Sequence, residues 1–232
     1  MFRAFFQVRF TPWLLPLIMI LILWGSTTGA GAKEEHQTFS FMISLSEKKC
    51  QIAIWLSDEK GVFVDTVYVT RYIAKKGLGN RRGGLDDKWG GPRLSTLPVW
   101  AHSRGVDYGN GNFYPPKNKP LPDAITSATP KAGKFLWEWK PKKALASSNY
   151  FYYIEVNKSF DKNEHHNYSW YRCQPSVVWR GIIKVGNQIS KSEAKIIGHG
   201  HVAGKDGSIN SDLSKLTTAI GLIDKVKVVY HP

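Results

Sequence analysis

Alternation of apolar and polar residues with a period of two runs through most of this sequence, and it limits the possible fold more than any other feature. Every second residue of "TFSFMISL", from Phe39 to Leu45, is apolar, and "CQIAIWL" repeats the pattern from Cys50. Successive side chains of a strand point to opposite faces, so such segments are typical of half-buried β-strands. The same reasoning predicts further strands at residues 62–69, 134–140, 149–156, 176–186, 193–202 and 225–230.

Short strands separated by turn signals, without helices between them, predict an all-β fold. We expect an antiparallel β-sandwich of the immunoglobulin-like type rather than a parallel α/β sheet. The spacing of Leu216, Ile220 and Ile223 predicts one short helix before the last strand.

Residues 77–122 interrupt the alternation with a long segment rich in Gly, Pro and Asn. A segment of this length inside a compact domain is either functional or disordered. Its aromatic and apolar residues indicate that it is a packed insertion rather than a disordered one. These residues are Trp89, Leu97, Trp100, Phe113 and Tyr114.

The first 32 residues have the layout of a secretory signal peptide. Arg3 and Arg9 precede an apolar stretch at residues 12–24, and small residues follow as far as Ala32. We expect cleavage after Ala32, a single domain at residues 33–232, and a periplasmic or otherwise exported protein. An uncleaved membrane anchor is the alternative, although the apolar stretch is shorter than the roughly 20 residues that span a bilayer.

The chain is strongly basic, with 32 Lys and Arg against 18 Asp and Glu and a formal net charge of +14. Removing Arg3 and Arg9, and no acidic residue, would leave 30 against 18, or +12. Such a charge favours anionic partners. The lysines are spread along the chain, however, and a basic surface that keeps the protein soluble accounts for them as well. Nucleic acid is not an expected partner outside the cytoplasm.

The two cysteines, Cys50 and Cys173, allow two interpretations. Export would permit a disulfide between them. Two separate buried thiols are the alternative, and the sequence does not decide between these states.

Motifs of common hydrolases and nucleotide enzymes, such as G-x-S-x-G, H-E-x-x-H and the Walker loop, do not occur in the sequence. His199 and His201 stand two apart on a predicted strand and would share a face, as a pair of metal ligands would. No third ligand is identifiable, so polar surface is the simpler interpretation and no metal site is expected.

The segment "PDAITSATPKAG" surrounds one hydroxyl, that of Thr129, with small residues. Thr126, Ser127 and Ala128 directly precede it, and Asp123 lies six positions before it. A turn would require Gly, Asn or Pro for backbone reasons, and most of these residues are none of the three.

"DAITSAT" resembles the acceptor sequence of proteins that carry FMN on a threonine through a phosphoester bond. These include the C and G subunits of sodium-pumping and related electron-transport complexes. The resemblance implies FMN attachment at Thr129, with Asp123, Thr126, Ser127 and Ala128 forming the recognised segment; Ser127 stands where Gly is commoner. It also implies an FAD:protein FMN transferase as partner, for which small neighbours would leave the hydroxyl accessible.

The succession of five stretches resembles a family of predicted exported bacterial proteins of unknown function, whose immunoglobulin-like domain is similar to a flagellar hook cap. The stretches are "RLSTLPVWAHSRG", "DAITSATPKAGKFLWEW", "YFYYIEVNKSFD", "VVWRGIIKVG" and "DGSINSDLSKLTTA". Instead of the family's Gly-bearing turn after the tryptophan strand, this chain has "PKKALASSN". The resemblance implies membrane-bound electron-transfer proteins as partners.

If FMN is attached, the stretch from Arg93 to Gly105 is the expected lining. Trp100 would stack on the flavin ring, Arg93 or Arg104 would pair with the phosphate, and His102 would hydrogen-bond the cofactor. A packed loop with surface arginines is the alternative for each residue.

Two functions follow from these observations, and metal-dependent hydrolysis through His199 and His201 is a more distant third. The first is an exported redox carrier with covalent FMN, which would not be a complete enzyme. The second is an immunoglobulin-like binding module without a cofactor, in which "DAITSAT" begins a strand.

Overall fold

The computed structural model describes residues 37–47, 49–76, 92–122, 125–167 and 173–232. The chain divides into two units, 1–34 and 35–232, and every described residue belongs to the second. The predicted signal peptide and its cleavage site after Ala32 therefore lie outside the described residues. Within the described part, no helix has both the length and the apolar character needed to cross a membrane.

The second unit consists mainly of β-strands. The strands are β1 (Thr38–Leu45), β2 (Cys50–Ser57), β3 (Phe63–Thr70), β4 (Thr126–Ser127), β5 (Gly133–Trp139), β6 (Ser148–Lys158), β7 (Val177–Val185), β8 (Ser190–Glu193), β9 (Lys195–His199) and β10 (Ile223–His231). The helices are α1 (Arg71–Lys76), α2 (Pro98–Ser103) and the 3₁₀-helix η2 (Thr218–Leu222).

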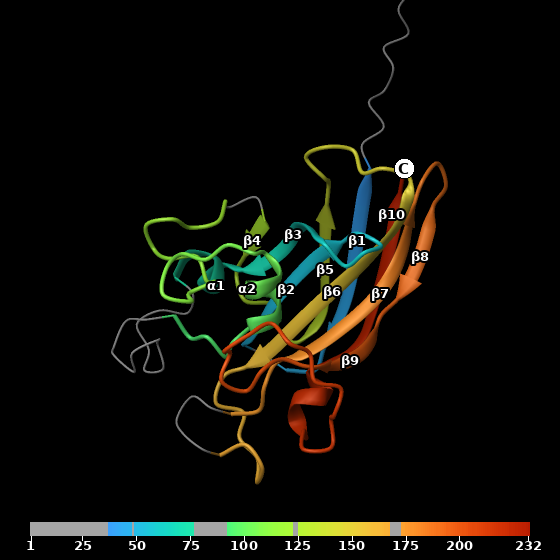
Figure 1. Ribbon diagram of the computed structural model, residues 1–232. Helices are drawn as coiled ribbons and strands as arrows, with labels where there is room; N and C mark the ends of the chain where they lie inside the picture. The colour runs from blue at the N-terminus through green and yellow to red at the C-terminus, as the bar shows by residue number, and fades with distance from the viewer. Residues whose placement is uncertain (1–36, 48, 77–91, 123–124, 168–172) are drawn as a thin grey trace, which may run out of the picture. The chain divides into compact units, whose positions relative to one another are not determined.

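The strands form two sheets that pack face to face, as Figure 1 shows. One sheet has the order β5-β1-β10-β8, and the other has the order β4-β3-β2-β6-β7-β9. The expected β-rich sandwich is therefore present, but the expectation of purely antiparallel pairing is wrong at one place. β4 runs parallel to β3, with Val69 opposite Thr126 and Thr70 opposite Ser127. A parallel pair requires a crossover connection, and the chain between β3 and β4 contains α1 and α2.

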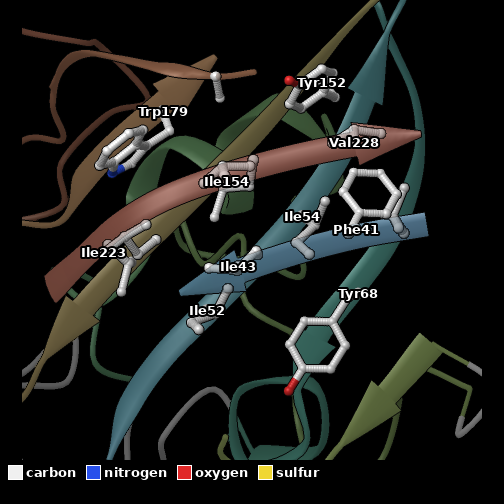
Figure 2. Packing of buried hydrophobic residues seen from close by; sticks show 14 of the residues in the cluster. Phe41, Ile43, Ile52, Ile54, Tyr68, Tyr152, Ile154, Trp179, Ile223 and Val228 are labelled. Carbon is white, nitrogen blue, oxygen red and sulfur yellow. The ribbon is translucent and has the colours of Figure 1, made fainter. Parts of the chain in front are cut away.

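The main core lies between the two sheets. Alternate residues of β1 from Phe39 to Leu45 are buried, so the predicted strand at residues 38–45 and its inward face are confirmed. Figure 2 shows side chains of β1, such as Phe41 and Ile43, meeting those of β2 and β6 in the space between the sheets. The ring of Phe41 meets that of Tyr152 edge-on, with 6.1 Å between centroids.

Strand β2 departs from the predicted alternation because all eight of its residues are buried. Ala53 and Trp55, which point away from the main core, belong to a second apolar cluster on the outer face of the six-stranded sheet. The insertion supplies the cover, since Leu97, Trp100 and Tyr114 are all fully buried in the same cluster. The described part of the insertion, residues 92–122, thus packs as an additional layer.

The two α-helices were not predicted from the sequence. Each has only six residues, which is too short for a helical period to stand out or for a helix to be stable without tertiary contacts. The short helix expected around Leu216, Ile220 and Ile223 is a 3₁₀-helix at residues 218–222 instead. Ile223 already belongs to β10, where it pairs with Leu45.

The strand predicted at residues 193–202 is present but shorter, as β9 at Lys195–His199 in the larger sheet. Its expected first residue, Glu193, belongs to β8 of the smaller sheet instead. Ala194 lies between them and donates its backbone N–H to Val226 at 3.2 Å. One short segment therefore crosses from one sheet to the other.

Candidate functional site

Thr129 lies two residues after the end of β4 and lines a pocket of about 270 Å³. The other lining residues are Arg71, Tyr72 and Lys75 from α1, and Ala128. The side chain of Thr129 is half-buried, whereas Ala128 is exposed. The threonine singled out by the sequence therefore lies at the wall of a pocket and not in the core.

The parallel pairing of β3 and β4 explains why α1 and Thr129 meet. Parallel strands end at the same edge of a sheet, so the residues after Thr70 and after Ser127 emerge side by side. The first continue into α1, and the second lead to Thr129. The hydroxyl of Tyr68 donates to the carbonyl of Ala128 at 3.2 Å, which fixes the backbone next to Thr129.

Helix α1 is anchored by its other face. Ile73 and Ala74 are fully buried in the second apolar cluster. The carbonyl of Ala74 accepts a hydrogen bond from the backbone of Leu121 at 3.0 Å. Arg71 and Lys75, four residues apart, lie on the same side of the helix and line the pocket together.

The pocket is positively charged. Arg71 and Lys75 are its ionisable cations, and no acidic residue is among the described residues that line it. Two cations next to a hydroxyl favour an anion such as a phosphate group, and they would also favour a phosphoester formed on that hydroxyl.

The remaining residues of the predicted acceptor segment are only partly described. Asp123 lies outside the described residues, so its expected role stays a prediction. Thr126 and Ser127 are half-buried and form β4, with backbone pairing to β3. The small-residue run is therefore partly an edge strand of the six-stranded sheet.

The residues expected to line the flavin lie elsewhere, in the layer formed by the insertion. Trp100 has no exposed surface, and its indole N–H donates to Thr66 Oγ1 at 3.1 Å. The guanidinium of Arg104 lies 5.0 Å from the Trp100 ring centre, and Tyr114 packs against the ring edge-on. In this arrangement Trp100 is a packing residue of the second cluster.

His102, Arg104 and Arg93 also have structural contacts here. His102 Nδ1 donates to the carbonyl of Pro98 at 2.8 Å, and Arg104 donates to the carbonyl of Phe113 at 3.3 Å. Arg93 is only 3% exposed and lies over the ring of Phe160. These three residues and Trp100 do not line the pocket of Thr129, so the structure does not bring the two predicted groups together.

Glu155 of β6, which no sequence motif singles out, is a buried carboxylate that holds α2 on the sheet. Its Oε2 accepts the backbone N–H of Trp100 at 2.8 Å, and its Oε1 accepts that of Val99 at 3.2 Å. The hydroxyl of Ser176 also donates to Oε1, at 2.5 Å. Leu97 occupies the N-cap position and makes no side-chain cap, so Glu155 supplies the acceptor that the helix lacks. One acidic residue within the apolar strand "YFYYIEV" was the available signal.

The titration of Glu155 should make stability depend on pH. Burial raises the pKa of Glu155 from its ordinary value of 4.5 to about 7, although the hydrogen bonds from Ser176, Trp100 and Val99 oppose the rise. The folded protein thus holds this proton more tightly than the unfolded chain does. The contribution of this group to the free energy of unfolding is largest below pH 4.5 and falls as the pH rises to about 7.

Glu155→Gln cannot titrate and should lack this fall in stability. We expect the wild type to lose unfolding free energy relative to the variant as the pH rises from about 5 to about 8. Urea unfolding of both proteins at the two pH values measures the shift. If the difference in unfolding free energy between the two proteins is the same at both pH values, Glu155 does not titrate in this range.

The two histidines considered as metal ligands do not share a strand face. β9 ends at His199, whose Nδ1 donates to the carbonyl of Gly200 at 2.8 Å. His201 lies in the following turn, where its Nδ1 accepts the backbone N–H of Ala203 at 3.0 Å. Within the described ranges, no three His, Cys, Asp or Glu side chains are grouped as a metal site would require.

Both cysteines are buried free thiols in the structure. The thiol of Cys50 donates to the carbonyl of Glu47 at 3.7 Å. Burial raises the pKa of the Cys50 thiol to about 11 and also raises the pKa of Cys173. The reactive thiolate is therefore disfavoured at both positions.

Comparisons with protein-family models, with curated proteins and with solved structures find no match to this chain.

Proposed function

We propose that this protein is an exported electron-transfer module that carries FMN covalently on Thr129. Its sandwich would be of the immunoglobulin-like type, and its partners would be an FAD:protein FMN transferase and membrane-bound electron-transfer proteins. The observation that carries the proposal is the basic pocket in which Arg71 and Lys75 lie beside Thr129.

The pocket suits the phosphate end of FMN. Its volume of about 270 Å³ is slightly below the roughly 300–1,000 Å³ of typical small-molecule pockets. It can therefore accept the phosphate and part of the adjoining chain, while the flavin ring would remain outside. A ring held at the surface is accessible to redox partners.

Attachment would be a phosphoryl-type transfer from FAD. The Oγ atom of Thr129 forms a bond to the FMN phosphorus, the pyrophosphate P–O bond of FAD breaks, and AMP leaves. The hydroxyl proton passes to a base of the transferase. Arg71 and Lys75 would stabilise the negative charge on the phosphate, which is the main requirement for such a transfer. When bound, FMN would supply the redox chemistry, a transfer of two electrons and two protons between partners.

The test is co-expression of the full chain with an FMN transferase directed to the periplasm. We expect flavin fluorescence from the protein band in a denaturing gel, and an added mass equal to one FMN less one water. Thr129→Ala should remove both signals completely because the acceptor oxygen is absent. Ser211→Ala is the matched control, since it removes an exposed hydroxyl outside the recognised segment and should keep both signals.

The alternative is a binding module without a cofactor, and one observation favours it. Thr126 and Ser127 form β4, as expected if "DAITSAT" begins a strand. An unmodified protein in the presence of a transferase that labels a known substrate would support this function and reject the first.

A further inference from the structure

We infer that Arg71 and Lys75 form a phosphate-binding site that selects flavins bearing a phosphate and binds them before any covalent bond exists. The inference rests on the proposed function and deepens it, because it assigns substrate selection to residues of this chain. The chemical class of the ligand is a flavin 5′-phosphate, either FMN or the FMN half of FAD.

The charges of the two residues match a phosphate. A guanidinium presents its N–H groups in a planar fork that can contact two phosphate oxygens, and an ammonium adds a compact charge. Arg71 and Lys75 lie one helical turn apart and line the same pocket as Thr129. A phosphate placed between them would lie in the pocket that Thr129 also lines.

The site rests on a fixed support. Ile73 and Ala74 are buried against the sheet, so α1 cannot rotate without exposing them. The hydrogen bond from the hydroxyl of Tyr68 to the carbonyl of Ala128 fixes the backbone next to Thr129. The cations and the hydroxyl are therefore placed together before a ligand arrives, which reduces the entropy lost on binding.

The phosphate and not the flavin ring should decide affinity. Tyr72 is 39% exposed and is the aromatic residue among those that line the pocket. Riboflavin has the same ring as FMN but lacks the phosphate, so it cannot use the two cations. We expect FMN to bind on the order of tenfold or more tightly than riboflavin, as for one charge-assisted hydrogen bond.

The experiment measures non-covalent binding to the Thr129→Ala chain, which cannot form the ester. Quenching of flavin fluorescence gives the Kd of FMN and of riboflavin, and inorganic phosphate serves as competitor. The double variant Arg71→Gln with Lys75→Gln should raise the Kd of FMN by on the order of tenfold or more and leave the Kd of riboflavin unchanged. Thermal unfolding of each variant verifies that the fold is intact.

The matched control is Lys131→Gln with Lys134→Gln, which removes the same charge at exposed positions close to Thr129. If both double variants weaken FMN binding equally, or if FMN and riboflavin have equal Kd values, the inference is overturned. Labelling of the Thr129-containing chain that persists at the same rate without Arg71 and Lys75 would also overturn it, while the proposed function would stand. Selective FMN binding by a chain that is never labelled would preserve the inference and reject the proposed function.

Discussion

Replacement of Glu155 by alanine is expected to lower the free energy of unfolding by about 3–5 kcal/mol. The carboxylate accepts hydrogen bonds from the backbones of Val99 and Trp100 and from the hydroxyl of Ser176. Its removal leaves three buried donors without their acceptor, and each such donor costs about 1–3 kcal/mol. Single domains have only about 5–15 kcal/mol in total, so this loss is a large share.

Urea unfolding followed by tryptophan fluorescence measures the effect. Trp100, a residue of α2, contributes to this signal from within the insertion, because its indole is buried and hydrogen-bonded to Thr66. Glu155→Gln retains one acceptor oxygen and should lie between the wild type and the alanine variant. Glu138→Ala changes an exposed glutamate of β5 and should alter stability by less than about 0.5 kcal/mol. If Glu155→Ala and Glu138→Ala had the same effect, Glu155 would not anchor the helix.

The second large effect is expected from Gly181→Ala, with a loss of about 2–4 kcal/mol. Gly181 lies opposite Tyr152 in the pairing of β6 with β7. A Cβ atom at this position would lie 2.2 Å from both Cζ and the hydroxyl oxygen of Tyr152, far inside van der Waals contact. The ring is fully buried and its hydroxyl donates to Ser192 at 3.0 Å, so any movement breaks this bond and disturbs the packing against Phe41.

Gly221→Ala is the matched control for Gly181→Ala. A Cβ atom at Gly221 would meet no other atom within 4 Å, so this substitution should be close to neutral. Thermal unfolding of the two variants compares them directly. Equal midpoints would mean that the Tyr152 ring moves aside without cost, contrary to the expectation.

The sequence predicts a strand well when the residues that cover it in space leave a local pattern, and poorly when a distant segment covers it. β1 was predicted with its correct bounds because one face packs on the core and the other does not, which leaves a clear period of two. β2 carries the same pattern, but its outer face lies under the insertion. That cover depends on a segment far away in the chain, and no local pattern records it.

In the candidate site, too, local sequence patterns predict some residues, while others depend on contacts between distant segments. The hydroxyl of Thr129 could be found from its small neighbours, because those neighbours are adjacent in sequence. Arg71 and Lys75 could not be found, because they reach Thr129 only through the parallel pairing of a two-residue strand. The residues named from the loop, Trp100 and Arg104, were chosen for their chemistry, but burial and packing against each other determine their position.

The shortness of β4 has a consequence for how an enzyme could reach the acceptor. β4 joins the sheet through only two residue pairs, Val69 with Thr126 and Thr70 with Ser127, and it lies at the sheet edge. Edge segments with so few backbone bonds open locally at a small fraction of the global unfolding free energy. If Thr129 carries FMN, β4 can therefore leave and rejoin the sheet edge while the two sheets behind it stay closed, and its pairing with β3 returns Thr129 to the pocket of Arg71 and Lys75.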